Sequence, residues 1–193
     1  MKSLSLRFRL MIFLTVFTWL AVSSQSVQNG VTFRTLSIQH GLSQSIVNAM
    51  TQDSRGFMWF VTEDGLNRYD GYTFKIFKPD PKDPNSLAHN EIKSISESSD
   101  GTLWIGSFYK GLEHFDPATE KFAHYQHDPA DPASLGNNIV WAVLEDRKGR
   151  VWVGTGGGGL DLLDRKTGSF RHFRRDPSDP SSISGDDVRA LFE

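Results

Sequence analysis

The sequence predicts an all-β fold, a β-propeller built of four-stranded antiparallel blades, and three observations support this. The 193 residues include 12% aromatics, 17 Gly and 8 Pro without a long helical period, which is typical of short strands and turns. Trp59, Trp104 and Trp152 recur 45 and 48 residues apart. "DPKDPNSL", "DPADPASL" and "DPSDPSSI" begin at 80, 128 and 176. Such periods indicate a repeat architecture.

Each repeat contains four short apolar segments separated by turn residues, "IKSISES", "TLWIGS", "GLEHFD" and "KFAHYQH" in the second unit. Four such segments predict an antiparallel meander. In the third unit, "VWAVLE" is expected to place Val140 and Ala142 on one face and Trp141 and Val143 on the other. Because both faces are then apolar, each sheet must lie between two neighbours, as propeller blades do.

The N-terminal segment 1–24 has the pattern of a secretory signal peptide, with a basic start, an apolar run from Leu10 to Val22 and then small residues. The run of 13 residues is shorter than the roughly 20 that span a bilayer, although a retained anchor is the alternative. Removing 1–24 leaves 18 basic and 23 acidic side chains, so nucleic acid is not an expected partner. We expect export to the periplasmic side of the membrane.

The predicted domain organisation continues with a short linker at 25–32 and a partial propeller at 33–193. The expected blades lie near 42–80, 87–128 and 135–176, with a truncated fourth from 183. "FRTL" at 33–36 matches the fourth-strand pattern and is expected to complete the last blade. Because propellers have roughly four to eight blades, we expect the chain to be an N-terminal fragment whose remaining blades lie elsewhere in the protein.

Three stretches carry a resemblance to a known family: "DSRGFMWFVTEDGLNRYD", "SSDGTLWIGSFYKGLEHFD" and "EDRKGRVWVGTGGGGLDLLD". They resemble the two-component regulator propeller repeat, whose pattern is Asp-x-x-Gly, apolar-Trp-apolar-Gly-Thr, Gly-Gly-Leu and apolar-Asp. The first unit departs from it at Phe60 and Thr62 and has a shorter loop. The residues of the third unit that fit are Gly149, Trp152, Gly154, Thr155, Gly159, Leu160 and Asp164.

The resemblance, which covers about residues 33–193, implies a ligand-sensing role in signal transduction. In that family the repeats form the periplasmic sensor of membrane-bound receptors, often as a pair of propellers. A further β domain, a transmembrane helix and a cytoplasmic output domain follow, commonly a histidine kinase and sometimes a diguanylate cyclase. The resemblance therefore implies a membrane-anchored, dimeric parent protein and no catalysis by this chain.

Ligand contacts are predicted on one face of the blades, where the connections from strand two to three and from strand four to the next strand one emerge. Variable loops on a rigid scaffold are where binding usually occurs. Aromatic rings beside amides and acids predict a small-molecule or oligosaccharide ligand. The candidate binding residues are Glu63, Asp64, Asn90, Phe108, Tyr109, Lys110 and Asn138.

No catalytic residue, metal ligand or cofactor is predicted. "GTGGGGL" at 154–160 lacks the Lys-Ser/Thr of a phosphate loop, so we interpret it as a tight connection. His124 and His127 lie three apart on a predicted strand and so on opposite faces. Two alternatives remain, a secreted interaction scaffold and a propeller enzyme such as a quinoprotein. "DRKTGSF" at 164–170 suggests the latter, although Phe170 stands where quinoprotein repeats carry Trp.

Overall fold

Three four-stranded antiparallel sheets make up the regular structure, which confirms the predicted fold class. The computed structural model describes residues 33–193, so the predicted signal peptide and linker lie outside the described residues. One 3₁₀ turn, η1 (Ile38–His40), precedes the strands. Within 33–193, no helix is long and apolar enough to cross a membrane.

Each sheet is a meander of four consecutive strands. Blade 1 contains β1 (Val47–Gln52), β2 (Met58–Thr62), β3 (Gly65–Tyr69) and β4 (Phe74–Phe77). Blade 2 contains β5 (Ile92–Glu97), β6 (Leu103–Ser107), β7 (Leu112–Asp116) and β8 (Lys121–Tyr125). Blade 3 contains β9 (Val140–Glu145), β10 (Val151–Thr155), β11 (Leu160–Leu163) and β12 (Phe170–Phe173).

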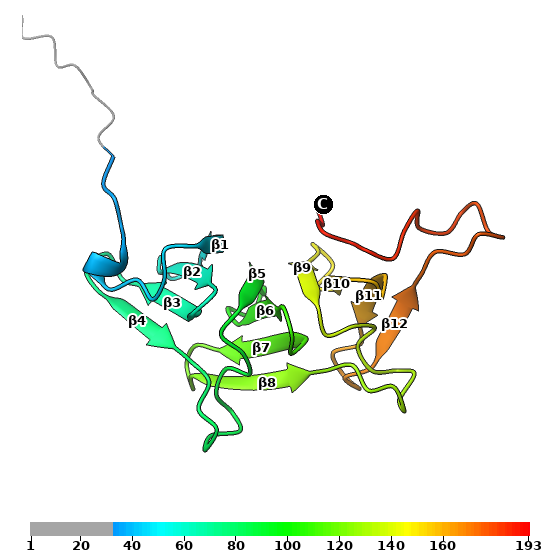
Figure 1. Ribbon diagram of the computed structural model, residues 1–193, viewed down its shortest axis with the longest axis horizontal. Helices are drawn as coiled ribbons and strands as arrows, with labels where there is room; N and C mark the ends of the chain where they lie inside the picture. The colour runs from blue at the N-terminus through cyan, green and yellow to red at the C-terminus, as the bar shows by residue number, and fades with distance from the viewer. Residues whose placement is uncertain (1–32) are drawn as a thin grey trace, which may run out of the picture. The chain divides into compact units, whose positions relative to one another are not determined.

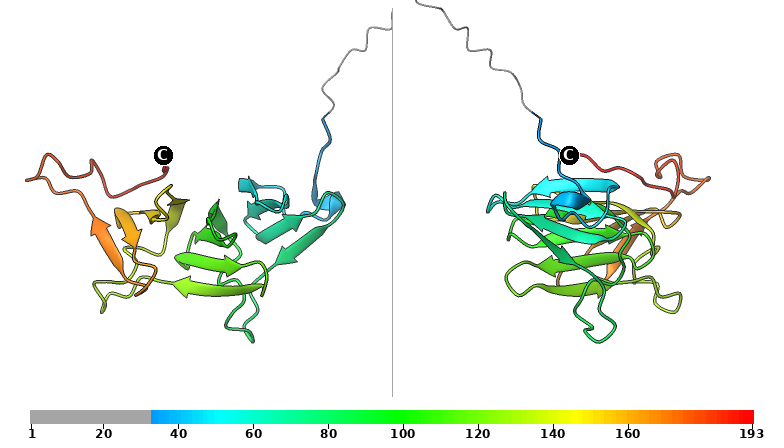
Figure 2. Two further views of the ribbon diagram at one scale, coloured as in Figure 1. Left: turned by 180° about the vertical axis from the view of Figure 1, so that it is seen from behind. Right: turned by 60° about the vertical axis from the view of Figure 1, so that its left-hand side comes forward.

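The three blades lie side by side in chain order within the compact unit 36–193 (Figure 1). Their first strands β1, β5 and β9 lie together on the inner side, and the fourth strands lie outside (Figures 1 and 2). Residues 33–36, the predicted extra strand, form no strand. Residues 183–193 approach blade 3, where the Val188 amide donates to the Thr155 carbonyl at 3.0 Å. This segment thus occupies the place of a first strand beside blade 3.

A β-bulge interrupts the first strand of every blade. In blade 3, Val140 pairs with Thr155 and Ala142 pairs with Gly154, so Trp141 is the extra residue. Gly154 and Thr155 are neighbours in β10, so they point to opposite faces of the sheet, and each residue of β9 lies on the same face as its partner. The prediction that Val140 and Ala142 share a face is therefore wrong. Val140 instead joins Val143 in the core. Asn48 and Lys93 are the corresponding extra residues of blades 1 and 2.

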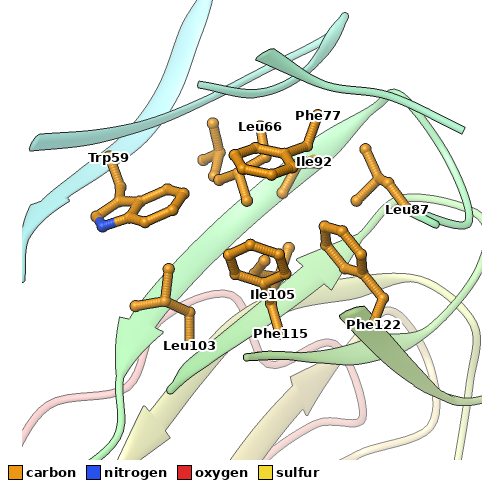
Figure 3. Packing of buried hydrophobic residues seen from close by; sticks show 10 residues of the cluster. Trp59, Leu66, Phe77, Leu87, Ile92, Leu103, Ile105, Phe115 and Phe122 are labelled. Carbon is orange, nitrogen blue, oxygen red and sulfur yellow. The ribbon is translucent and has the colours of Figure 1, made fainter. Parts of the chain in front are cut away.

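The hydrophobic core lies between blades, as expected of sheets that are apolar on both faces. Between blades 1 and 2, Trp59 contacts the rings of Phe77 and Phe115 at centroid distances of 6.0 and 5.6 Å (Figure 3). A second cluster, built around Trp104 and Val140, joins blades 2 and 3. Trp59 and Trp104 are fully buried, whereas Trp152 is partly buried. Burying each such side chain contributes about 2–3 kcal/mol.

Close approach between blades explains the glycine of the repeat. A Cβ on Gly106 would lie 2.5 Å from Val140 Cγ1, and one on Gly154 would lie 2.9 Å from Val188 Cγ1. The first strand of each following blade therefore packs directly on this glycine. In blade 1 the strand register places Val61, rather than Phe60, at this position, because Val61 pairs with Ala49 as Gly106 pairs with Ser94.

The aspartate of the repeat accepts a hydrogen bond from the tryptophan indole. In blade 1, Trp59 Nε1 donates to Asp53 Oδ2 at 2.9 Å, and in blade 3 Trp152 Nε1 donates to Asp146 Oδ2 at 3.0 Å. Burial raises the pKa of Asp53, but hydrogen bonds from Trp59 and Arg55 outweigh it and hold this pKa below its usual value. Blade 2 has Ser98 instead of Asp, and the buried indole nitrogen of Trp104 has no hydrogen-bond partner.

A glutamate at the end of β5, of β9 and of the segment 183–193 contacts the hairpin turn of the preceding blade. Glu97 accepts from the Ser54 amide at 2.8 Å, Glu145 from the Ser99 amide at 3.1 Å, and Glu193 from the Arg147 amide at 2.8 Å. The same side chain therefore makes the same contact at three successive positions. We call this edge, with the β1–β2, β5–β6 and β9–β10 turns, the turn face.

Candidate functional site

The opposite edge of the blades, which we call the loop face, joins its loops through backbone atoms. The amide of Gly65 donates to the Asn90 carbonyl at 2.9 Å, and that of Gly111 donates to the Asn138 carbonyl at 2.9 Å. Each bond runs from the connection between strands two and three to the segment that enters the next blade. The structure thus brings together the two loop sets in which ligand contacts are predicted.

Aromatic and basic side chains form a continuous row on this face. The ring of Phe108 lies 4.6 Å from Tyr109 and 5.3 Å from Trp141, centroid to centroid. Tyr109 also meets His89 at 5.0 Å. Lys93 Nζ lies 5.2 Å from the Phe108 centroid, a cation–π distance. These five residues, which we call the aromatic row, come from β5, the β6–β7 loop, β9 and the segment that enters blade 2.

Carboxylates surround the lysine of the aromatic row. Lys93 Nζ lies 2.8 Å from Glu91 and 3.5 Å from Glu63, which belongs to blade 1. Of the predicted residues, Glu63 is therefore at the edge of the row. Asp64 points elsewhere, toward Lys78 Nζ at 2.6 Å. An exposed pair of that kind contributes little to stability, so Asp64 and Lys78 remain available for ligand contacts.

The two predicted asparagines have structural duties. Asn138 Oδ1 accepts from the His127 amide at 2.8 Å, so this side chain is occupied. At the same position in the preceding connection, Asn90 Oδ1 is buried without a hydrogen-bond partner. The reason lies in the sequence, because Pro79 stands where the later connection has His127, and proline has no amide hydrogen.

Backbone geometry fixes the loop that carries the aromatic rings. The Phe108 amide donates to the Glu91 carbonyl at 3.0 Å, and the Lys110 amide donates to Ser107 Oγ at 2.8 Å. Lys110 itself is exposed. Gly111 has φ 78°, and a Cβ there would lie 2.3 Å from the Tyr125 carbonyl oxygen. The loop therefore has to reach β7 through a glycine.

Blade 3 presents backbone where blade 2 presents rings. Gly156 occupies the position of Phe108, and its amide donates to the Ile139 carbonyl at 2.9 Å. A Cβ on Gly156 would lie 3.0 Å from Trp141 Nε1. The Gly156–Gly158 run thus makes room for the Trp141 indole, in line with its interpretation as a tight connection.

Lys93 and Trp141 are the strand residues of the row and, like His89, they are not among the predicted binding residues. Both are bulge residues, and both directly follow the recurring apolar column of Val47, Ile92 and Val140. The residue after this apolar column differs from repeat to repeat, which could have marked it as a candidate binding position. The assumption of strict alternation along the strand instead assigned it to the packing between blades. The arrangement offers stacking surfaces, one cation and two carboxylates for binding. Within 33–193, no group of three or more His, Cys, Asp or Glu side chains is placed to hold a metal.

Comparisons with known proteins agree with this architecture. Residues 41–64, 86–109 and 134–157 match the family model of the two component regulator propeller. Over 73 residues, or 38% of the chain, the sequence is 40% identical to histidine kinase P4 of Formosa agariphila, of which it spans 5%.

Two solved structures from B. thetaiotaomicron are similar over most of the chain. The extracellular domain of a hybrid two component system is 31% identical, with a TM-score of 0.73 over 81% of this chain and 22% of that one. The extracellular domain of a one component system has a TM-score of 0.65 over 80% of this chain and 20% of that one. At 18% identity the second shows the fold alone.

The chain spans about a fifth of the length of these structures and a twentieth of the kinase. Each matched segment runs from the approach to a first strand, through the Trp-bearing second strand, into the loop face. The matched segments therefore contain the buried Trp59 and Trp104 and the loop-bond acceptors Asn90 and Asn138. This chain carries three repeats of the two-component regulator propeller family and is homologous to the extracellular domain of a hybrid two-component system.

Proposed function

We propose that this chain is part of a ligand-sensing propeller of a membrane-bound signalling receptor, exposed on the periplasmic side. The homology to an extracellular domain supports the location, and the histidine kinase relative supports a phosphotransfer output in the parent protein. In this proposal the described residues recognise a ligand and perform no catalysis. The output chemistry belongs to another part of the receptor.

The observation that carries the proposal is the aromatic row on the loop face. Tyr109 is 53% exposed although it contacts the rings of His89 and Phe108. Backbone bonds hold these loops, so the row is a firm platform whose side chains are not needed to join the blades. An exposed tyrosine ring with a neighbouring lysine and carboxylates suits the apolar face and hydroxyls of an oligosaccharide.

Binding at this face would reach the parent protein through the blades. The row contains residues of blades 2 and 3, and Glu63 of blade 1 lies beside it. A ligand that contacts several blades favours one arrangement of them, or one state of a dimer, over others. The receptor signal then follows from this differential affinity.

The test is binding of neutral gluco-, xylo- and manno-oligosaccharides to the intact protein, measured by calorimetry and Trp fluorescence. The double variant Phe108→Ala/Tyr109→Ala should bind at least about 10-fold more weakly, because each aromatic ring that stacks on a ligand contributes about 1 kcal/mol to the binding free energy. Tyr72→Ala is the matched control, since Tyr72 is 89% exposed in the β3–β4 turn at the other edge. Equal binding by the double variant and the control would overturn the proposed site.

A further inference from the structure

Blades 2 and 3 contain a buried carboxylate on the third strand that faces a histidine on the fourth strand. Glu113 and Asp161 are both completely buried. His172 Nδ1 lies 2.6 Å from Asp161 Oδ1. His124 Nδ1 lies 3.3 Å from Glu113 Oε2, a looser contact that falls short of a hydrogen bond. The same pair therefore occurs at the same place in two successive blades.

Each pair connects two strands to the Asp-Pro loop that arrives from the preceding blade. His124 Nε2 lies 3.1 Å from the Pro84 carbonyl oxygen, and His172 Nε2 lies 3.0 Å from that of Pro132. The carboxylates also accept hydrogen bonds from backbone amides just after these loops. The Ala88 amide donates to Glu113 at 3.0 Å, and the Gly136 amide donates to Asp161 at 2.7 Å. The loops at 80–86 and 128–134 project from the outer side of the blades (Figure 1).

The contacts of the ring nitrogens determine how many protons each pair must hold. A carbonyl oxygen only accepts, so Nε2 must carry a hydrogen. A second proton must then lie between Nδ1 and the carboxylate, because a lone pair facing an anion is repulsive. Once the carboxyl group is ionised, a neutral imidazole can satisfy one of its two partners but not both.

We propose that the Glu113–His124 and Asp161–His172 pairs are proton-operated latches that hold the Asp-Pro loops 80–86 and 128–134 against the outer strands. When a pair loses its shared proton, the imidazole keeps one hydrogen. If that hydrogen remains on the carboxylate side, the proline carbonyl loses its donor and the loop is released. This inference does not depend on the proposed ligand of the loop face.

Burial and charged neighbours determine how strongly each carboxylate–histidine pair holds its shared proton. The Glu113 carboxylate raises the pKa of His124, and burial raises the pKa of Asp161. His172 shares a cavity of about 360 Å³ with the charged or titratable groups His127, Asp128, Asp131 and Arg174. Arg174 opposes the proton and the aspartates favour it. The loop over His124 contributes Asp80, Lys82 and Asp83, and both aspartates accept amides within the loop.

The direction of the pH effect follows from these raised pKa values. A group whose pKa is raised in the folded protein stabilises the structure below its unfolded pKa, and this stabilisation is lost as the pH rises through the folded pKa. The latch at His124 should therefore be closed near pH 6 and should open as the pH rises above about 6.5, the usual pKa of histidine. The latch at Asp161 should likewise open with rising pH, through the raised pKa of the Asp161 carboxyl.

Blade 1 supplies an internal control without a titratable group. There Asn67 replaces the carboxylate, its Oδ1 accepts from the Ser43 amide at 2.9 Å, and Ile76 replaces the histidine. Hydrogen exchange of the intact protein at pH 6 and 8.5, corrected for the intrinsic rate, should show at least about 10-fold weaker protection of both Asp-Pro loops at the higher pH. Protection around Ser43 should not change.

Two further measurements keep the inference falsifiable. In His124→Gln and His172→Gln the corresponding loop should exchange quickly at both pH values, and the other loop should keep its pH step. Nitrogen NMR of the ring should find both nitrogens of His124 protonated at pH 6. Equal pH profiles for the loops and the Ser43 segment, or a neutral His124 ring beneath a well-protected loop, would overturn the latch.

Discussion

The turn face and the loop face join the same blades with different atoms. On the turn face a side chain makes the bond, since Glu97 and Glu145 each grip the preceding hairpin turn. On the loop face the backbone makes it, through the Gly65 and Gly111 amides. A bond made by a side chain requires that side chain at its position. A bond made by the backbone constrains only the donor glycine, Gly65 or Gly111, so the neighbouring loop positions can carry different side chains.

The residues at corresponding positions bear this out. Phe108 and Tyr109, which follow β6 of blade 2, occupy the same positions as Gly156 and Gly157, which follow β10 of blade 3. Although rings stand at these positions in one blade and glycines in the other, the Phe108 and Gly156 amides make the same bond to the residue that precedes the first strand of the same blade, Glu91 and Ile139. This difference supports the proposal that recognition takes place on the loop face. Four substitutions test this division, in order of decreasing effect.

The largest effect is expected for a methyl group placed against the loop-face backbone. Gly111→Ala would bring Cβ to 2.3 Å from the Tyr125 carbonyl oxygen at φ 78°, and should lower the free energy of unfolding by about 4 kcal/mol. Gly101 on the turn face has φ 79° but no atom within 4 Å of its Cβ position. Gly101→Ala should cost only about 1 kcal/mol. Urea denaturation compares them, and equal costs would refute the claim that the loop face depends on backbone contact.

A smaller effect is expected when the Trp–Asp bond of blade 1 is lost. Asp53→Ala leaves the Trp59 indole and the Arg55 and Phe57 amides without their acceptor, which should cost about 3 kcal/mol. Ser98→Ala at the same position of blade 2 removes no acceptor from Trp104 and should cost about 1 kcal/mol. Thermal unfolding gives both values. A larger loss for Ser98→Ala would contradict the role assigned to the aspartate.

The contact of Glu145 on the turn face predicts that the free energy of unfolding decreases at acidic pH. Burial raises the pKa of Glu145, but hydrogen bonds from Ser98 and Ser99 prevail and hold this pKa below its usual range. Its contribution is therefore present above about pH 4.5 and lost as the pH falls through the folded pKa. Glu145→Gln should cost about 1.5 kcal/mol at pH 7 and nothing near pH 2.

The control for this pH effect is Glu120→Gln. Glu120 forms an exposed pair with Lys75, and its replacement should change the free energy of unfolding by less than about 0.5 kcal/mol at any pH. Chemical denaturation at a series of pH values measures both variants. Parallel profiles for wild type and Glu145→Gln would show that the contact of Glu145 with the β5–β6 turn contributes no pH-dependent stability.

The smallest effect on stability is expected from the aromatic row. Tyr109→Ala removes a ring that is 53% exposed and lies against the rings of His89 and Phe108. Its free energy of unfolding should change by less than about 0.5 kcal/mol. Calorimetric unfolding measures this directly. A loss comparable to that of Asp53→Ala would place Tyr109 among the residues that assemble the blades.

Most of the fold could be predicted from the sequence because repetition is itself a structural signal. Trp59 and Trp104 recur because each fills the space before the next blade, and their burial follows from that spacing. The alternation within "VWAVLE" could not be predicted, because the bulge at Trp141 depends on how β9 meets β10. One extra residue reverses the faces of everything that follows it in a strand.

The candidate site was predictable only in part. Topology alone places Phe108, Tyr109 and Glu63 at one edge, since alternate connections of a meander emerge together. Lys93 and Trp141 escaped because they belong to strands, where residues are expected to pack rather than bind. Asn138 was included on its type, but its partner, the His127 amide, lies across a loop that sequence spacing does not reveal.

By itself, the sequence determined the repeat, the four strands of each blade and the two-sided burial that requires neighbours, because these depend on local periodicity. Tertiary structure alone decided which atoms join the blades, which bulge residues reach the loop face, and that Glu113 and Asp161 meet His124 and His172. Those contacts depend on distances between segments far apart in the chain. Local pattern specifies how a strand pairs with its neighbour, whereas the packing of whole sheets specifies what their edges present.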